Sequence, residues 1–305
     1  MKYKINKEDI EQILNTNVPQ FVQDRLQETP LLYQELTDIQ LNDYLVHVVS
    51  ILVNDITKSG KHRIDEWEIG WSENLKEFIK TKNYNSLIPK YHGKNRFVRW
   101  NGKIVNPITD NFDYAIHIAF VDTIINKYLS SDIKNVYEFG CGPGYHLLRL
   151  HDQNPELNLF GLDWASSSQK TISEINQEFG YNINSHRFDF FNPDENFKIN
   201  ESSLVYTVAA LEQVGNNYES FVQYLLKQNP NVCIHMEPIA ELLDETKLID
   251  FLSVKYFQKR NYLSNFLTYL RRLESEGIIE IIDQRRINSG SYFIEGHSLV
   301  VWRKK

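Results

Sequence analysis

A glycine-rich turn flanked by acidic residues is the part of this sequence best suited to bind a ligand. Residues 136–146 read Val-Tyr-Glu-Phe-Gly-Cys-Gly-Pro-Gly-Tyr-His, a strand-like run that ends in Gly-x-Gly-x-Gly before a helical run. Glycines let a ligand approach the backbone closely, and the first amides of the next helix are free to donate hydrogen bonds. Asp163 ends the next strand-like run, nineteen residues after Gly144, where a carboxylate suits ribose hydroxyls. The pattern predicts a site for a nucleoside-containing ligand.

Two features separate this turn from the loop of a nicotinamide-dependent dehydrogenase. That loop follows the pattern Gly-x-Gly-x-x-Gly, which requires glycine at position 145, where this chain has Tyr145. Glu138, two residues before the first glycine, would repel a pyrophosphate and attract an ammonium group. We therefore expect a ligand with an amino-acid end and no phosphates.

The same residues carry a resemblance to a known family. Residues 136–144 resemble the first motif of class I S-adenosylmethionine-dependent methyltransferases, and Gly-Leu-Asp-Trp at 161–164 resembles their second. The resemblance covers roughly residues 110–305 and implies S-adenosyl-L-methionine as cofactor. It implies that Glu138 holds the methionine amino group, directly or through water, and that Asp163 binds the ribose. It also implies the other cofactor residues: Gly140, Cys141, Gly142 and Gly144 at the methionine part, Trp164 against the adenine, and Asp189 and Phe190 beside the adenine amino group.

A second region of resemblance follows the fourth strand-like run. Ala210-Leu211-Glu212-Gln213-Val214 resembles the segment that often reads Leu-Glu-His in this superfamily. The resemblance places Leu211 at the cofactor and Glu212 at the reacting groups. Gln213 stands where the histidine would be, so no catalytic role is expected for it.

The elements that must position these residues form an α/β pattern. Strand-like runs alternate with helical runs from residue 135 onward, which is typical of βαβ units and a parallel sheet. The strands are expected at 136–139, 157–162, 183–190, 204–208 and 232–236, with helices at 145–154, 168–179, 218–227, 241–256 and 262–276. Two further β-rich runs, 278–287 and 291–302, have no helix between them and should pair antiparallel. The resemblance implies a Rossmann-like doubly wound sheet of seven strands in the order 3-2-1-4-5-7-6, with the last strand antiparallel.

The N-terminal part of the chain has a different texture. Amphipathic spacing predicts helices over 38–56 and 66–79, and Asn101-Gly102 predicts a tight hairpin between 97 and 105. We therefore expect an N-terminal helical cap over residues 1–110 that forms the substrate side, and a methyltransferase domain over residues 111–305. Residues 1–110 carry 15 basic and 15 acidic side chains, so the net charge of −7 falls entirely in the second part.

Candidate catalytic residues lie at the expected carboxyl ends of the strands. His235 and Glu237 share one side of the fifth strand by alternation, and His297 begins the last strand. If that strand lies antiparallel beside the fifth, its start meets the end of the fifth. We expect one histidine, His297 or His235, to be a general base oriented by Glu237. A structural His–Glu hydrogen bond is the alternative. A metal site made by the three side chains fits less well, because the helical His spacing of many metal sites is missing.

A basic and aromatic segment precedes the sheet. Residues 90–103 contain five Lys or Arg and no acid, with Arg96 and Arg99 among them. One interpretation is a lid that binds an anionic substrate, such as a phosphorylated or nucleotide-linked sugar. The other is a solvated hairpin.

Composition limits the remaining classes. The 305 residues are 42% hydrophobic and 24% charged, values typical of globular proteins. A net charge of −7 argues against a nucleic-acid partner, and no apolar run is long enough for a membrane span. Only two cysteines and no secretory leader predict a cytoplasmic protein. We expect a methyltransferase that acts on a small molecule, most simply on a hydroxyl, with a sugar-containing metabolite preferred. N-methylation of an amine or peptide side chain, and a non-catalytic binding module, are the alternatives.

Overall fold

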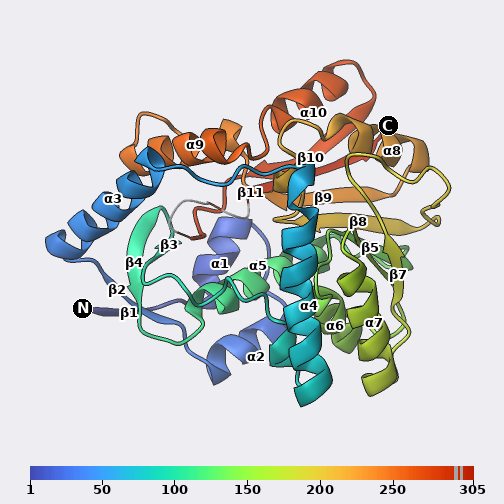
Figure 1. Cartoon of the computed structure of the whole chain (residues 1–305), viewed down its shortest axis with the longest axis horizontal. Helices are drawn as coiled ribbons and strands as arrows, with labels where there is room; N and C mark the ends of the chain where they lie inside the picture. Colours follow the sequence, from blue (N-terminus) through green and yellow to red (C-terminus); the bar gives the residue numbers. More distant parts are fainter. Residues whose placement is uncertain (292–294, 296–297) are drawn as a thin grey trace.

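The centre of the molecule is a seven-stranded sheet. The computed structural model describes residues 1–291, 295 and 298–305. The strands are β5 (Asn135–Phe139), β6 (Asn158–Asp163), β7 (Asn184–Arg187), β8 (Ser203–Val208), β9 (Val232–Glu237), β10 (Ile279–Arg285) and β11 (Ser298–Lys304). Their order is β10-β11-β9-β8-β5-β6-β7, and β11 is antiparallel to both neighbours (Figure 1). This confirms the α/β class, the order 3-2-1-4-5-7-6 and the antiparallel last strand.

Helices cover both faces of this sheet. They are α5 (Phe112–Tyr128), α6 (Tyr145–Gln153), α7 (Ser166–Phe179), α8 (Glu219–Gln228), α9 (Leu248–Arg260) and α10 (Phe266–Ser275). Alternate residues of β5 belong to two separate core clusters, Val136 to one and Tyr137 to the other. The first cluster includes apolar residues of α5, α6 and α7, and the second those of α8 and α10. The central strands β5, β8 and β9 are therefore buried on both faces, which explains their largely apolar sequences, whereas the edge strand β7 is polar and mostly exposed.

The N-terminal part contains a small sheet as well as helices. Strands β1 (Lys2–Lys4), β2 (Leu32–Glu35), β3 (Val98–Trp100) and β4 (Lys103–Pro107) pair antiparallel in the order β1-β2-β4-β3. The expected hairpin is confirmed, with Asn101 and Gly102 at φ 46° and 75°. The N-terminal part was expected to be a helical cap with one hairpin, and the structure adds β1 and β2 to it. β1 and β2 are three and four residues long and partly exposed, so they carry no clear apolar alternation.

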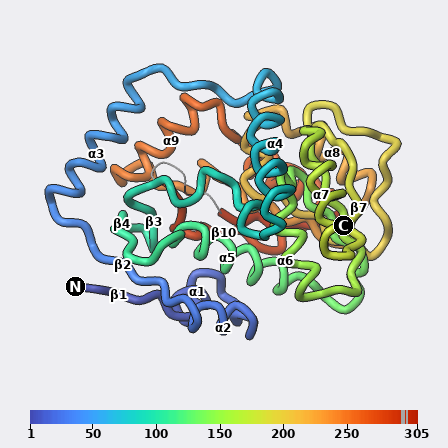
Figure 2. The backbone as a smooth tube through the Cα atoms, turned by 60° about the horizontal axis from the view of Figure 1, so that its bottom comes forward, coloured from blue at the N-terminus to red at the C-terminus, as the bar shows by residue number. Residues whose placement is uncertain are grey.

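The helices of this part pack against helices that flank the large sheet. Helices α1 (Lys7–Leu14) and α2 (Gln20–Glu28) contact α5, α3 (Asp38–Val53) contacts α9, and α4 (Ile64–Thr81) contacts α7 (Figure 2). Ile10 and Leu14 share a core cluster with Ile116 and Leu147, so residues on both sides of position 110 bury one another.

The connection after β9 differs from its expected form. A helix was expected at 241–256, but the chain makes a short 3-10 turn at Ala240–Leu242 and then α9 from Leu248. The Asp244 carboxylate accepts from the backbone amide and hydroxyl of Thr246, which favours a turn between the two. Among the described residues, no helix combines the length and the apolar character that crossing a membrane requires.

Candidate functional site

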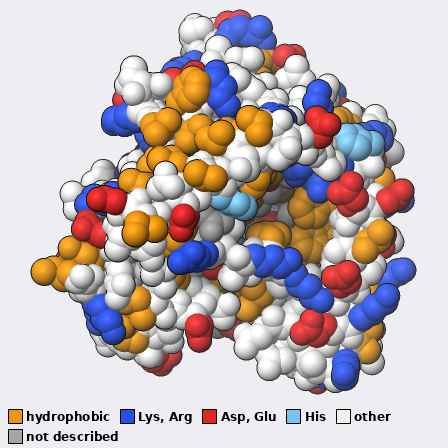
Figure 3. Space-filling view, turned by 60° about the vertical axis from the view of Figure 1, so that its left-hand side comes forward, with side chains coloured by type: hydrophobic (Ala, Val, Ile, Leu, Met, Phe, Trp, Pro, Cys, Tyr) orange, Lys and Arg blue, Asp and Glu red, His pale blue; other side chains and the backbone are white. Residues whose placement is uncertain are grey.

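A cavity of about 320 Å³ lies where the N-terminal part meets the carboxyl ends of β5 and β8. Its walls come from the glycine turn, from Val208–Gln213, from α4 and the loop before β3, and from Ser289–Ser291. Figure 3 shows this face of the molecule hollowed near its middle, with Lys and Arg side chains at the rim. The volume lies in the range of small-molecule sites, and ligands of open α/β sheets bind at this edge.

The glycine turn has the backbone geometry that its sequence predicts. Gly140, Gly142 and Gly144 have φ of 79°, 52° and 78°, where other residues are strained. A Cβ atom on Gly140 would lie 2.2 Å from the Cβ of Ala210. The amides of Gly140 and Cys141 donate to the carbonyl of Leu162, which fastens the turn to the end of β6. The turn thus presents bare backbone at the start of α6.

Asp163 lies against this turn. Its Oδ2 accepts from the amide of Gly142 at 2.9 Å, and its Oδ1 accepts from the amide of Ala165 at 2.8 Å. Burial raises the pKa of Asp163 to about 6, against the effect of these hydrogen bonds. Asp163 also lines a second, smaller hollow of about 50 Å³ together with Trp164, Phe188 and Phe190.

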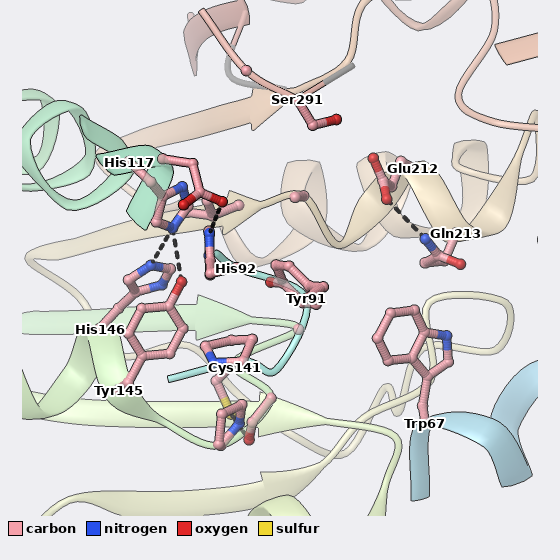
Figure 4. Close-up of a pocket in the computed structure, with 18 of the residues that line it drawn as sticks. Trp67, Tyr91, His92, His117, Cys141, Tyr145, His146, Glu212, Gln213 and Ser291 are labelled. Atoms are coloured by element: carbon pink, nitrogen blue, oxygen red, sulfur yellow. Dashed lines mark hydrogen bonds and ion pairs between the residues drawn. The ribbon is translucent and has the colours of Figure 1, made fainter. Parts of the chain in front are cut away.

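Glu138 is buried at the end of β5 and both its oxygens have partners. Nδ1 of His146 lies 2.7 Å from one oxygen, and the hydroxyl of Tyr206 donates to the other at 3.0 Å. Nε2 of His146 in turn lies 2.9 Å from Nε2 of His117, which is 2.7 Å from the hydroxyl of Tyr145 (Figure 4). His117, Tyr145 and His146 line the cavity and were not selected from the sequence. The only signal was the position of Tyr145 and His146 directly after the glycines.

A second pair missed by the sequence lies on the same wall. Nδ1 of His92, from the loop before β3, is 3.4 Å from Oδ2 of Asp113 on α5. Burial would raise the pKa of Asp113, but hydrogen bonds from His92 and the amide of Gly93 lower it. Nε2 of His92 is buried and has no hydrogen-bond partner in the part of the chain that the structure describes.

Glu212 lies on the opposite side of the cavity, after β8. Its Oε1 accepts from the side-chain amide of Gln213 at 2.8 Å, while its Oε2 is buried without a partner among the described residues. Burial and then the charge of Glu237 raise the pKa of Glu212 to about 8. Gln213 is itself held by Arg63 at 3.0 Å. Glu212 is therefore a carboxyl group poised to exchange a proton near neutral pH.

Glu237 holds the backbone next to Glu212. Its carboxylate accepts from the amides of Ala210, Leu211 and Glu212 at 3.1, 3.1 and 3.2 Å. Burial raises the pKa of Glu237 to about 7. Glu237 is not among the residues that line the cavity, so its contacts fix the turn after β8.

His235 lies too deep to meet a substrate. It is fully buried, and its ring packs against Phe266 and Trp302 while Nδ1 lies 3.0 Å from the hydroxyl of Thr207. Burial lowers the pKa of His235 to about 3, so it stays neutral. The helix α10 covers this position, which strand alternation could not reveal.

The expected meeting of the last strand with β9 is observed, since Ser298 pairs with Glu237. His297 lies outside the described residues. Within 1–291, 295 and 298–305, no group of His, Cys, Asp and Glu has an arrangement that could hold a metal ion.

The other residues implied for the cofactor are distributed around the two hollows. Phe190 and Trp164 line the smaller hollow, and Cys141 lines the larger, where burial raises the pKa of its thiol. Asp189 lines neither: one of its oxygens lies 3.0 Å from Nζ of Lys61. Leu211 is fully buried and contributes its amide to the contact with Glu237.

Three cations of the basic segment, Lys90, Arg96 and Arg99, already have partners. Nζ of Lys90 lies 3.3 Å from Glu77, and the guanidinium of Arg96 lies over the ring of Phe97. Arg99 is buried and donates to the hydroxyl of Ser253 at 2.6 Å. Carboxyl groups of Asp250 and Glu295 lie 3.9 and 3.8 Å away from it. These contacts favour a structural role for the segment over an anion-binding lid.

Comparisons with known proteins agree with this architecture. No protein-family model and no curated protein matches the sequence. Among solved structures, the [4+2]-cyclase SpnF aligns with a TM-score of 0.51 at 12% identity, covering 79% of this chain and 80% of that one. Human N-acetylserotonin methyltransferase in complex with SAM aligns with a TM-score of 0.42 at 15% identity, covering 64% of this chain and 55% of that one. The magnesium protoporphyrin IX methyltransferase of Synechocystis PCC 6803 with bound SAM aligns with a TM-score of 0.45 at 12% identity, covering 64% of this chain and 83% of that one.

These likenesses concern the fold alone. The sheet order, the antiparallel last strand and the glycine turn after β5 define a Rossmann-like doubly wound fold, and the alignment with SpnF agrees with it. One fold hosts several chemistries, and the first of these neighbours is named for a cyclisation, so the activity must be argued from the site.

Proposed function

We propose that this chain binds S-adenosyl-L-methionine at the glycine turn and transfers its methyl group to a small molecule. One observation carries the proposal: three glycines with positive φ lie between two buried acids, Glu138 and Asp163, at the ends of adjacent parallel strands. The bare backbone suits a ligand that lies flat against it. A Cβ on Gly140 would clash with the Cβ of Ala210, so glycine at this position lets the turn pack against the segment after β8.

Glu138 and Asp163 are each held by hydrogen bonds, and each lines a hollow where one part of the ligand would lie. Glu138 accepts from His146 and Tyr206, and an ammonium group at the cavity wall would share its negative charge. Asp163 accepts backbone amides and faces the smaller hollow, where ribose hydroxyls would donate to it. When bound, the cofactor would supply a methyl group on a positively charged sulfur, and the acids of the cavity would favour that charge.

We place the proton acceptor at Glu212 rather than at a histidine. One carboxyl oxygen of Glu212 has no hydrogen-bond partner among the described residues, and Glu212 lines the cavity. Because its pKa is raised to about 8, Glu212 becomes available as a base as the pH rises toward that value. The bound cofactor would supply the methyl group and would keep the electron pair of the broken carbon–sulfur bond, and ionised Glu212 would accept the proton that the acceptor hydroxyl loses. Methylation of a hydroxyl requires such a base, so we prefer a hydroxyl as the methyl acceptor.

N-methylation is the second candidate. Asp113 and Glu138 both line the cavity, so a cationic amine would find carboxylates there. A sugar-containing acceptor and a cytoplasmic location belong to the same proposal; the two cysteines, Cys141 and Cys233, are buried and unpaired, as a reducing compartment would leave them.

A methyl-transfer assay tests the proposal. Formation of S-adenosylhomocysteine would be measured with panels of hydroxyl-containing and amine-containing metabolites. We expect turnover with a hydroxyl acceptor, and we expect Glu212→Gln to lower kcat by about 10²–10⁴-fold with cofactor affinity unchanged. Turnover with amines alone, unaffected by Glu212→Gln, would replace the hydroxyl proposal. Cofactor binding without turnover on either panel would favour a binding module.

A further inference from the structure

Two tryptophans from the N-terminal part stand between the two hollows. Trp67 and Trp71 lie one turn apart on α4, with ring centroids 5.3 Å apart and planes at 29°. Both line the large cavity and the small hollow beside Asp163 (Figure 4 shows Trp67 at the cavity edge). The guanidinium of Arg63 lies over the Trp67 ring at 5.3 Å. The tryptophans therefore belong to the proposed cofactor site, although they lie outside the domain that carries its motif.

The two indoles cover the place where a nucleoside would lie. A Cβ on Gly142 would lie only 3.0 Å from the six-membered ring of Trp71, so the indole rests directly on the glycine turn. The hollow beside Asp163 is lined by both tryptophans, and its volume is about 50 Å³ against about 320 Å³ for the larger cavity. A purine placed beside Asp163 would therefore meet the two indoles.

Polar contacts hold this segment, residues 61–71, against the sheet edge. The carboxylate of Glu68 accepts from the amide of Ser167 at 3.1 Å and from the hydroxyl of Ser166 at 3.0 Å, at the start of α7. The guanidinium of Arg63 donates to the side-chain oxygen of Gln213 at 3.0 Å, and Gln213 lies beside the glycine turn. Nζ of Lys61 lies 3.0 Å from Asp189, a residue that the resemblance implies for the adenine. The ion pair of Lys61 with Asp189 is of the surface kind that is individually weak. The contacts of Arg63 with Gln213 and of Glu68 with the Ser167 amide are part-buried, so neither is sealed from water.

We propose that residues 61–71 form a lid over the nucleoside part of the cofactor site. The lid opens by releasing Glu68 from the start of α7, and Trp67 and Trp71 then close over the bound nucleoside. This inference rests on the proposed function, because it names the ligand that must pass. It predicts that opening of the lid limits how fast the ligand enters.

Stopped-flow tryptophan fluorescence with S-adenosylhomocysteine tests the lid in the full chain. We expect the observed rate to reach a ceiling as ligand concentration rises, because opening precedes entry. Glu68→Ala removes the tether to α7 and should raise this ceiling several-fold. The matched control is Glu73→Ala, five residues further along the same helix, whose carboxylate lies 3.6 Å from Nζ of Lys90; its ceiling should equal that of the wild type.

A second variant guards against a folding defect in the first. Trp71→Ala opens the glycine turn without touching Glu68, and it should raise the ceiling as well. A rate that rises linearly with concentration in the wild type, or equal ceilings in wild type, Glu68→Ala and Trp71→Ala, would overturn the lid while leaving the proposed function standing. If calorimetry detects no binding of S-adenosylhomocysteine by the folded wild type, the proposed function and the lid both fail.

Discussion

Three carboxyl groups, Asp163, Glu212 and Glu237, are buried at the ends of β6, β8 and β9. Burial raises their pKa values to about 6, 8 and 7. Each group therefore keeps its proton in the folded chain at a pH where the unfolded chain has lost it. The folded state binds more protons in that interval, so these groups lower the free energy of unfolding as the pH rises. Carboxyl groups with pKa values perturbed in this way are concentrated at functional sites, where their reactivity compensates for the lower stability.

Glu212 offers the clearest test of this titration. Between about pH 4.5 and pH 8, wild-type stability should fall as Glu212 ionises first in the unfolded chain. Glu212→Gln cannot ionise, so its free energy of unfolding should exceed that of the wild type by on the order of a few kcal/mol at pH 8 and match it more closely at pH 4.5. Denaturant titrations at the two pH values measure the difference. An identical pH dependence in both proteins would contradict the buried position of this carboxyl.

His235 should show the opposite sign. Its folded pKa of about 3 lies below the ordinary value of 6.5, so the unfolded chain binds the extra proton as the pH falls between these values. Wild-type stability should therefore drop below about pH 6.5, and His235→Gln should remove that part of the drop. Its affinity for S-adenosylhomocysteine should stay at the wild-type value in calorimetry. A large loss of affinity for S-adenosylhomocysteine in a folded His235→Gln protein would show that His235 contributes to the binding site.

At the scale of elements, close packing between β6 and its covering helices positions Asp163. Gly161 lies two residues before it, and a Cβ there would be 2.5 Å from Ile172 and 2.7 Å from Leu147. The missing side chain lets α6 and α7 approach the sheet at the point where the glycine turn begins. This packing role was not assigned from the sequence, where Gly161 counted only as part of a motif.

Gly161→Ala should destabilise the fold by about 1–3 kcal/mol through overpacking. Gly70→Ala is the matched control, because Gly70 lies in the interior of α4 with open space around its Cα. Removing a helix-interior glycine there should stabilise by about 0.5–1 kcal/mol. Denaturant midpoints of the two variants should move in opposite directions. A shift of the same sign in both would show that helix packing against β6 is not the cause.

The succession of strands and helices after residue 135 could be predicted because the central strands are buried on both faces and form apolar runs. The order of the strands in the sheet followed from the resemblance to a known family. The glycine turn, the acid after β6 and the Asn-Gly hairpin follow from local backbone chemistry. The cavity wall opposite the turn could not be predicted. His92 and Asp113, or His117 and His146, meet only through the packing of α5 against the N-terminal loop, and no local pattern records that contact. The depth of His235 depends on α10, which lies in the connection after β9.

At the scale of the whole molecule, the proposed cofactor site is shared between two parts of the chain. The large sheet supplies the glycine turn and the buried acids, and the N-terminal part supplies the tryptophans and His92. Residues of both parts also belong to one core cluster. A ligand that contacts both parts should therefore stabilise the chain as one unit.

Thermal or denaturant unfolding with added S-adenosylhomocysteine measures this coupling. At a ligand concentration about 100 times Kd, the free energy of unfolding should rise by about 2.7 kcal/mol. The rise should appear as one cooperative transition that shifts as a whole, because the ligand bridges both parts. If unfolding occurred in two transitions and the ligand shifted the midpoint of only one of them, the site would not be shared between the two parts.

The most direct measurement is isothermal titration calorimetry of the folded chain with S-adenosylhomocysteine. The account predicts one site per chain, with affinity at least about tenfold weaker, or roughly 1.4 kcal/mol, in Asp163→Ala. Asp163→Asn, which keeps an oxygen for the backbone amides, separates loss of the ribose contact from collapse of the turn. Absence of binding heat together with an unshifted melting transition in the wild type would contradict the account at its centre.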